Sequence, residues 1–262
     1  MRKLVSTIGI LLSFIVFSQI NAWAYSIVWG TPSYSSDTWA ESFSYDDNND
    51  YYDQNDNSSN ASELNSSTAT TPYAYGYATA FPKSEELQSM SLASSSLSDE
   101  NVYGYAYSNA HFSTTFSITG GNPGEIVPVY ASANLTGRLE NSVGDGDYDY
   151  AYSDVSASAG ISGMGNYYFE DWLEGNGLKT INGSYLQPFN LAIGTEYEAF
   201  AHLYTFAETW AVGEAASVFS PDSLTFNIRL TDNESVVPEP ATMSLLGLGL
   251  LGLLARRKPR TR

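Results

Sequence analysis

Large and small side chains alternate with a period of two residues over much of this chain. Three tyrosine triplets show the pattern most clearly, with single small or polar residues between the rings: Tyr73, Tyr75 and Tyr77; Tyr103, Tyr105 and Tyr107; Tyr148, Tyr150 and Tyr152. Successive side chains of a β-strand point to opposite faces of its sheet. Each triplet is therefore predicted to lie on one face of a strand.

The longest alternating run covers residues 197–212 and separates bulky from small residues. Phe200, His202, Tyr204, Phe206 and Trp210 fall on one face, and the other face is mostly alanine. A bulky face opposite a small face suits two closely packed sheets in which the rings either fill or cover one side. Residues 224–231 alternate apolar and polar side chains and predict a half-buried strand.

No helical periodicity interrupts the strand pattern between residues 25 and 236. Turns are predicted at Gly120–Gly124, Gly144–Gly146, Gly175–Gly177 and Asn182–Gly183, where Gly, Asn, Asp and Pro cluster. The sequence thus predicts an all-β ectodomain at 25–236, folded as an antiparallel β-sandwich or jelly roll of eight to ten strands. Residues 46–71 are rich in Asp, Asn and Ser, which predicts a mobile loop inside it, with a calcium-binding acidic loop as the alternative.

Both ends of the chain carry the features of export signals. Residues 1–24 begin with Arg2 and Lys3, continue through an apolar stretch, and end with small residues at Ala22 and Ala24, as in a cleavable signal peptide. Residues 237–262 contain Pro238, Glu239 and Pro240, then fifteen uncharged residues, then the basic cluster Arg256, Arg257 and Lys258. A helix of that length would span about 22 Å, short for a hydrocarbon core of roughly 30 Å. The pattern predicts a short C-terminal transmembrane helix whose cations stay on the cytoplasmic side.

The order of Pro-Glu-Pro, apolar helix and basic end resembles the PEP-CTERM sorting signal of Gram-negative bacteria. The resemblance implies recognition by an exosortase, a membrane protease that processes the tail while its helix holds the protein transiently in the membrane. It implies a bacterial protein exported to the cell envelope or surface, or released after processing. Family members tend to accompany exopolysaccharide and biofilm systems.

Charge and cysteine content narrow the choice of partners. The chain has 29 acidic residues against 11 Lys and Arg, and no cysteine. Nucleic acid is excluded as a partner by like-charge repulsion. Disulfides cannot hold the fold. A polyanionic surface remains compatible with divalent cations or with neutral polysaccharide.

Candidate chemistry is sparse, and no catalytic residues are assigned. The two histidines, His111 and His202, lack a G-x-S-x-G element or comparable framing for a Ser-His-Asp site. A glycoside hydrolase needs only two carboxylates, and Glu170 and Glu174 beside Trp172 keep that alternative open. The prediction is a non-enzyme without an obligatory cofactor.

Two binding sites are hypothesised. Asp145, Asp147 and Asp149 follow a glycine turn and can supply oxygen ligands for Ca2+, although their spacing is not that of an EF-hand. Trp172, Tyr167 and Glu170 form a mixture typical of sugar sites, because rings stack on sugars and carboxylates accept their hydroxyls. The alternative for the aromatic residues is packing within the sandwich.

These observations predict an exported structural or interaction component of an extracellular polysaccharide or biofilm matrix. A carbohydrate-binding module and a calcium-assisted adhesin are the alternatives, and a glycoside hydrolase is the competing enzyme class.

Overall fold

The computed structural model describes residues 25–46, 49–71, 74–82, 86–95, 102–144, 149–211 and 216–230. The predicted signal peptide at 1–24 and the sorting tail at 237–262 lie outside these residues, as does the predicted transmembrane helix. No segment among the described residues forms a helix long and apolar enough to cross a membrane.

The described chain is built from β-strands. Their bounds are β1 (Ser26–Trp29), β2 (Ser33–Asp46), β3 (Asn49–Ser59), β4 (Asn65–Thr70), β5 (Ala74–Pro82), β6 (Glu86–Ser95), β7 (Val102–Thr119), β8 (Ile126–Ser142), β9 (Tyr150–Ile161), β10 (Gly165–Glu174), β11 (Gly177–Ala192), β12 (Glu196–Ala211) and β13 (Ala216–Arg229).

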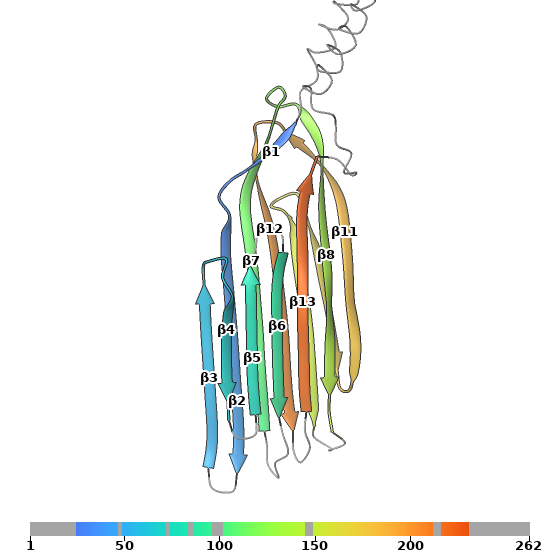
Figure 1. The fold of residues 1–262 in the computed structure, drawn as a ribbon. Coiled ribbons are helices and arrows are strands. Elements are labelled where there is room, and N and C mark those ends of the chain that lie inside the picture. Colours follow the sequence, from blue (N-terminus) through green and yellow to red (C-terminus); the bar gives the residue numbers. More distant parts are fainter. Residues whose placement is uncertain are drawn as a thin grey trace, which may run out of the picture.

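The strands form two sheets that pack face to face (Figure 1). Sheet A has seven strands in the order β10-β9-β12-β7-β2-β3, with the short β1 also paired to β7. Sheet B has six strands in the order β11-β8-β13-β6-β5-β4. Neighbouring strands run antiparallel, as in the β12–β7 and β11–β8 pairs. The predicted all-β antiparallel sandwich is confirmed, but the predicted eight to ten strands are too few, since the described residues form thirteen.

The prediction of a mobile loop at residues 46–71 is wrong. Most of this segment forms β3 and β4, which are the edge strands of the two sheets. Hydrogen bonds replace the missing apolar burial: Thr38 and Ser67 hydroxyls join β2 to β4 at 2.8 Å, and Asn65 Nδ2 donates to the carbonyl oxygen of Ser36 at 3.1 Å. Polar composition therefore did not preclude order here, because backbone pairing and inter-sheet hydrogen bonds satisfy the polar groups.

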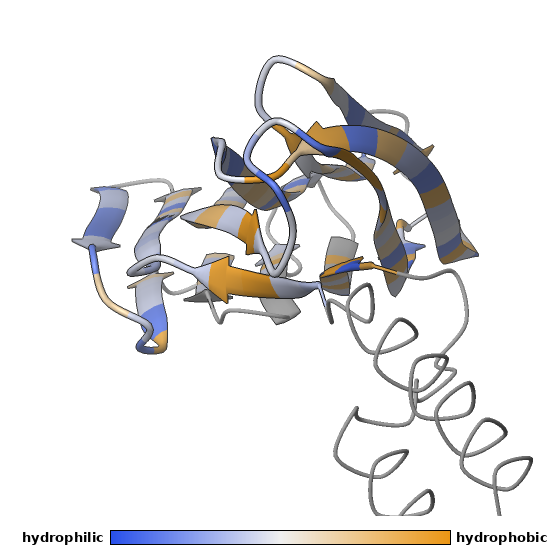
Figure 2. Cartoon of the chain, turned by 90° about the horizontal axis from the view of Figure 1, so that it is seen from above, coloured by the Kyte–Doolittle hydropathy of each residue, from blue (hydrophilic) through white to orange (hydrophobic). Residues whose placement is uncertain are grey.

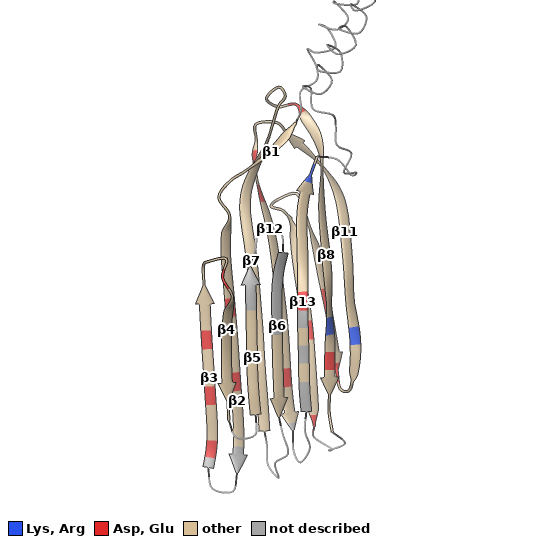
Figure 3. Cartoon of the chain, in the orientation of Figure 1, with Lys and Arg blue, Asp and Glu red and all other residues tan. Residues whose placement is uncertain are grey.

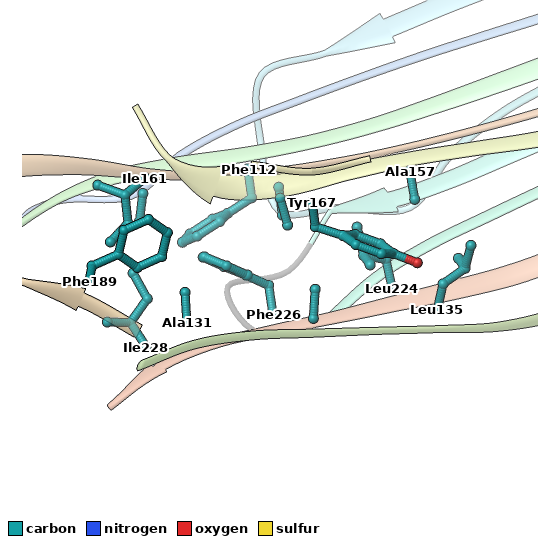
Figure 4. Close-up of a cluster of buried hydrophobic side chains, with 14 of the residues drawn as sticks. Phe112, Ala131, Leu135, Ala157, Ile161, Tyr167, Phe189, Leu224, Phe226 and Ile228 are labelled. Atoms are coloured by element: carbon teal, nitrogen blue, oxygen red, sulfur yellow. The ribbon is translucent and has the colours of Figure 1, made fainter. Parts of the chain in front are cut away.

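At the end of the sandwich that carries β1, large apolar side chains fill the space between the sheets. Figure 4 shows Phe112, Ile161, Phe189, Phe226 and Ile228 pointing into this layer. All five are buried. We call this region the wide core. The alternation of hydrophobic and hydrophilic residues along its strands appears as bands in Figure 2.

Towards the opposite end, where β2 and β3 turn, the inward-facing residues are almost all Ala, Ser, Thr or Gly. We call this region the narrow core. Its buried members include Ala40, Ser42, Ala93, Ala106, Ser108, Ala151, Ser153, Thr205 and Ala207. Ser91 of sheet B donates to the Thr205 carbonyl oxygen of sheet A at 2.9 Å, so hydrogen bonds cross between the sheets.

Two glycines of the narrow core show how closely the sheets approach. A Cβ at Gly76 would meet the carbonyl oxygen of Tyr105 at 2.5 Å and that of Glu41 at 2.9 Å. A Cβ at Gly104 would meet the carbonyl oxygens of Ser94 and Tyr75, both at 2.9 Å. Backbone faces backbone at these points, which leaves no room for larger inward residues.

Two of the predicted turns are found in the structure, and a third lies inside a strand. Gly120–Gly124 connects β7 to β8, and Gly175 connects β10 to β11 with a positive φ of 71°. Asn182–Gly183 is not a turn, because both residues lie inside β11. A Cβ at Gly183 would collide with the Tyr167 hydroxyl from sheet A. This glycine therefore makes room for a ring across the sandwich.

Candidate functional site

The outer face of sheet A collects most of the aromatic residues that alternate in the sequence. We call it the aromatic face. It comprises Trp39 and Phe43 of β2, Tyr52 of β3, Tyr103, Tyr105 and Tyr107 of β7, Tyr150 and Tyr152 of β9, Tyr168 and Trp172 of β10, and Tyr204, Phe206 and Trp210 of β12. The small residues between them face the narrow core, so the rings are driven to the outside.

Strand register arranges these rings in rows that cross the strands. The row nearest the β2–β3 turn runs through Tyr52, Phe43, Tyr103, Trp210 and Tyr150, each the direct partner of the next. Neighbouring strands lie about 4.8 Å apart and successive residues on one face about 7 Å apart. The rings therefore form a continuous platform and not isolated side chains.

Ring contacts join the rows to one another. Tyr105 and Phe206 meet edge to face with centroids 4.9 Å apart, and Phe206 also meets Tyr152 at 5.8 Å. Trp39 stacks beside Tyr107 at 6.2 Å. Such contacts orient the rings that take part in them, so this part of the platform is pre-organised for a flat apolar partner.

Carboxylates are interspersed among the rings, and basic residues are missing from the sheet. Glu41, Glu208 and Glu174 lie in the row of Tyr105, and Asp154 lies between Phe206 and Trp172. The strands of sheet A contain no Lys or Arg. Among the described residues, the basic side chains belong to β8, β11 and β13 of sheet B (Figure 3). The aromatic face is therefore negative and suited to neutral or cationic partners.

Burial by the neighbouring rings changes the protonation of this face. It raises the pKa of Tyr204 and Tyr103 above the ordinary range, so both hydroxyls stay protonated and able to donate hydrogen bonds. Burial raises the pKa of Asp154 to about 6, with the Glu170 charge adding to the rise and the hydrogen bond from Tyr152 opposing it. Asp154 is thus an acceptor at neutral pH that takes up a proton in mildly acidic solution.

The hypothesised sugar site is divided between two faces. Trp172 and Glu170 lie on the aromatic face, where Trp172 is 55% exposed. Tyr167 is wrongly assigned to this site, because it points into the sandwich (Figure 4). There it packs against Tyr185 with centroids 5.4 Å apart. The odd separation of 167 and 172 already placed the two rings on opposite faces of a strand.

Tyr168 takes the place that was assigned to Tyr167. Its ring is 62% exposed, and its hydroxyl donates to Glu170 Oε2 at 2.8 Å. Most of this face could not be recognised from the sequence of β10, because the partner rings come from β2, β7, β9 and β12. Only the strand order brings them beside β10.

Of the three hypothesised calcium ligands, only Asp149 belongs to the described residues. Asp145 and Asp147 lie outside the described residues, and Asp149 directly precedes β9. The described part of the chain contains no group of three or more His, Cys, Asp or Glu arranged to hold a metal ion. The calcium site stays a prediction.

The outer face of sheet B differs from the aromatic face in residue size. On β8, β11 and β13 it presents mainly Ser, Thr and Asn, among them Thr136, Asn182 and Thr225. Leu178 and Leu186 are isolated exposed apolar residues there, at 66% and 53%. Most of the large rings therefore lie on the outer face of sheet A, and a smaller pair, Tyr75 and Tyr77 of β5, stacks on the outer face of sheet B with centroids 6.3 Å apart.

A cavity of about 290 Å3 opens at the end of the molecule that carries β1. Trp29, Pro32, Phe112, Phe226 and Ile228 are among the residues that line it. None of its lining residues is charged, so it supplies neither an acid nor a base for chemistry.

Comparison with known proteins locates one motif and one distant structural likeness. No curated protein matches the sequence at a significant level. One similar solved structure is TmCBM61 in complex with β-1,4-galactotriose, at 10% identity, a TM-score of 0.19, and coverage of 63% of this chain and 90% of that chain. A likeness this distant carries no argument about this chain.

The motif agrees with the residues singled out at the C-terminus. Residues 236–258 match the PEP-CTERM protein-sorting motif, which includes Pro238, Glu239 and Pro240 and the basic cluster. The motif indicates a bacterial protein that is exported and sorted to the cell envelope. The chain is therefore a PEP-CTERM protein, with a β-sandwich ahead of its sorting signal.

Proposed function

We propose that this protein is a non-catalytic, polysaccharide-binding component of the extracellular matrix, exported and then processed at its tail by an exosortase. The observation that supports the proposal is the aromatic face, a continuous platform of oriented rings on one outer surface. Sugar rings have apolar faces that stack on aromatic side chains, and their hydroxyls pair with carboxylates and tyrosines.

The charge of the platform favours a neutral polysaccharide. Asp154, Glu170 and Glu208 would repel uronic acids, and sheet A has no basic side chain to pair with them. Neutral hydroxyls, by contrast, can donate hydrogen bonds to all three carboxylates. The width of the platform, five strands in the row of Tyr103, suits an extended chain of several sugars.

Affinity electrophoresis tests the binding. The full chain is run through gels that contain hydroxyethylcellulose or galactan as neutral probes, alginate as an anionic probe, and the polysaccharide of the producing bacterium. We expect retardation by at least one neutral polysaccharide. Trp172→Ala combined with Trp210→Ala should weaken it at least about tenfold, equivalent to about 1.4 kcal/mol.

Leu186→Ala is the matched control, because it removes an exposed apolar side chain from the other outer face. Equal weakening in the control, or unchanged retardation in the tryptophan variant, would contradict binding through the aromatic face. Retardation by alginate alone would contradict the expected charge preference.

Two further measurements address the other parts of the proposal. Mass spectrometry of the exported protein should find the segment after Pro240 removed, and an exported product that still ends at Arg262 would contradict processing. Release of soluble sugar that disappears with Glu170→Gln or Glu174→Gln would show a glycoside hydrolase and overturn the non-catalytic role.

A further inference from the structure

The two histidines of the chain stand directly opposite each other on the outer face of sheet A. His202 of β12 is the register partner of His111 of β7. Their ring centroids are 6.4 Å apart, with the ring planes tilted by 54°. Residues 91 positions apart in sequence are thus brought together by the pairing of two central strands.

Both imidazoles have nitrogen lone pairs free for a ligand. Neither ring makes a hydrogen bond to another described residue. Burial lowers the pKa of both rings, a change that the charge of Glu198 partly opposes for His111 and that His111 reinforces for His202. Two uncharged rings side by side therefore present lone pairs at neutral pH.

The distance between the rings suits a shared metal ion. Nitrogen-to-metal bonds of about 2.0–2.1 Å place two imidazole centroids on one ion about 5 to 6 Å apart. The observed separation exceeds this range only slightly, so rotation about the side-chain bonds can bring one nitrogen of each ring to a common point. Directly paired positions on antiparallel strands have Cβ atoms about 4.5–5.5 Å apart, which fixes the bases of the two side chains.

The surroundings favour a cation. Ser35, Ser158 and Tyr168 share the row of the histidines, and Glu170 and Glu198 lie on the same outer face. Sheet A contains no Lys or Arg that would repel a positive ion. The negative potential of the face raises the local concentration of cations.

We infer that His111 and His202 form a two-imidazole site for a divalent transition-metal ion such as Zn2+, Ni2+ or Cu2+. Imidazole nitrogen suits these ions, whereas Ca2+ prefers oxygen. With two protein ligands the ion keeps further positions for water or an external donor, so binding is reversible. The site is independent of the proposed polysaccharide binding and of the hypothesised calcium ligands.

Titration calorimetry with the untagged full chain tests the site, using ZnCl2 and NiCl2 as probes and CaCl2 as the negative probe. We expect one zinc ion per chain, and at least tenfold weaker zinc binding in His111→Asn and in His202→Asn. Ser113→Ala is the matched control, since it changes the same strand face without removing an imidazole. Zinc affinity that is unchanged in both histidine variants, or equally reduced in the control, would overturn the inference.

An NMR measurement on the wild-type chain avoids any dependence on variants that fail to fold. The imidazole resonances of both histidines should shift together over one range of zinc concentration. A shift of one imidazole alone, or of neither, would overturn the shared site. Because the chain has two histidines, two sets of imidazole signals are expected, and the test needs both sets to shift without deciding which set belongs to which ring.

Discussion

The wide core and the narrow core differ in the size of the side chains that lie between the two sheets. In the wide core, rings such as Phe112 and Phe226 lie inside, and the outer positions of β7 there are Ser113, Thr115 and Ser117. In the narrow core, Ala106 and Ser108 lie inside, and tyrosines cover the outside. The same strands thus exchange bulky and small faces along their length.

The comparison shows that size, and not only hydrophobicity, decides which face of a strand is buried. Where backbone meets backbone at Gly76 and Gly104, no ring fits between the sheets. The rings are left outside, where they contact one another and line a surface that a ligand can reach. The aromatic face is therefore a consequence of the small side chains in the narrow core.

The largest expected effect is the loss of a ring from the wide core. Phe116 is 1% exposed and packs against Trp29 and Tyr197 at centroid distances of 5.3 and 5.7 Å. Phe116→Ala should lower the free energy of unfolding by about 3–5 kcal/mol, because it leaves a cavity. Urea unfolding measures this, with Tyr52→Ala on the exposed edge as the control. Equal losses in the two variants would abolish the distinction between core and aromatic face.

A buried carboxyl at the boundary of the two cores should make stability depend on pH. Asp222 is 5% exposed, Ser220 donates to its Oδ2 at 2.9 Å, and its Oδ1 has no partner. Burial raises the pKa of Asp222 to about 7. Ionisation is thus easier in the unfolded chain, so stability should rise as pH falls from about 8 to about 4, by up to about 4 kcal/mol.

Unfolding of wild type and Asp222→Asn across this pH range measures the effect. The difference between the two proteins should be largest near pH 8 and should nearly vanish near pH 4. Parallel stability curves would mean that Asp222 keeps its ordinary pKa in the folded protein.

Adding a methyl group to the narrow core should push the sheets apart. Gly76→Ala places a Cβ against two backbone carbonyl oxygens and should cost about 1–3 kcal/mol. Gly177→Ala is the matched control, since its Cβ would meet only the flexible Leu173 side chain at 3.3 Å. Thermal unfolding compares them. A neutral Gly76→Ala would show that the sheets can separate freely at this end.

The smallest expected effect is the loss of one ring from the aromatic face. Phe206→Leu removes the edge-to-face contacts with Tyr105 and Tyr152 and keeps most of the apolar area. It should lower the free energy of unfolding by about 0.5–1.5 kcal/mol, measured by urea unfolding. A loss as large as that of Phe116→Ala would place the aromatic face within the core.

The strand pattern was readable from the sequence, and the two segments that were assigned to a loop and a turn depend on contacts with distant parts of the chain. The triplet that begins at Tyr103 and the apolar alternation from Leu224 to Ile228 predicted β7 and β13 correctly, because a period of two needs no tertiary information. The predicted loop at 46–71 was wrong because its strands are held by pairing partners elsewhere in the chain. The predicted turn at Asn182–Gly183 was wrong because the glycine accommodates the Tyr167 ring of the opposite sheet. Tyr167 was misassigned because the aromatic content of β10 was considered without its two faces.

By itself, the sequence determined the all-β class, the alternating faces and the C-terminal sorting motif, since each depends on neighbouring residues. Tertiary structure alone decided which face of the tyrosine- and alanine-rich strands turned inward, because both of their faces carry residues compatible with burial. The spacing between the sheets made that choice, admitting large rings at the β1 end and excluding them at the other. It also gathered rings from five strands into one row and set His111 beside His202.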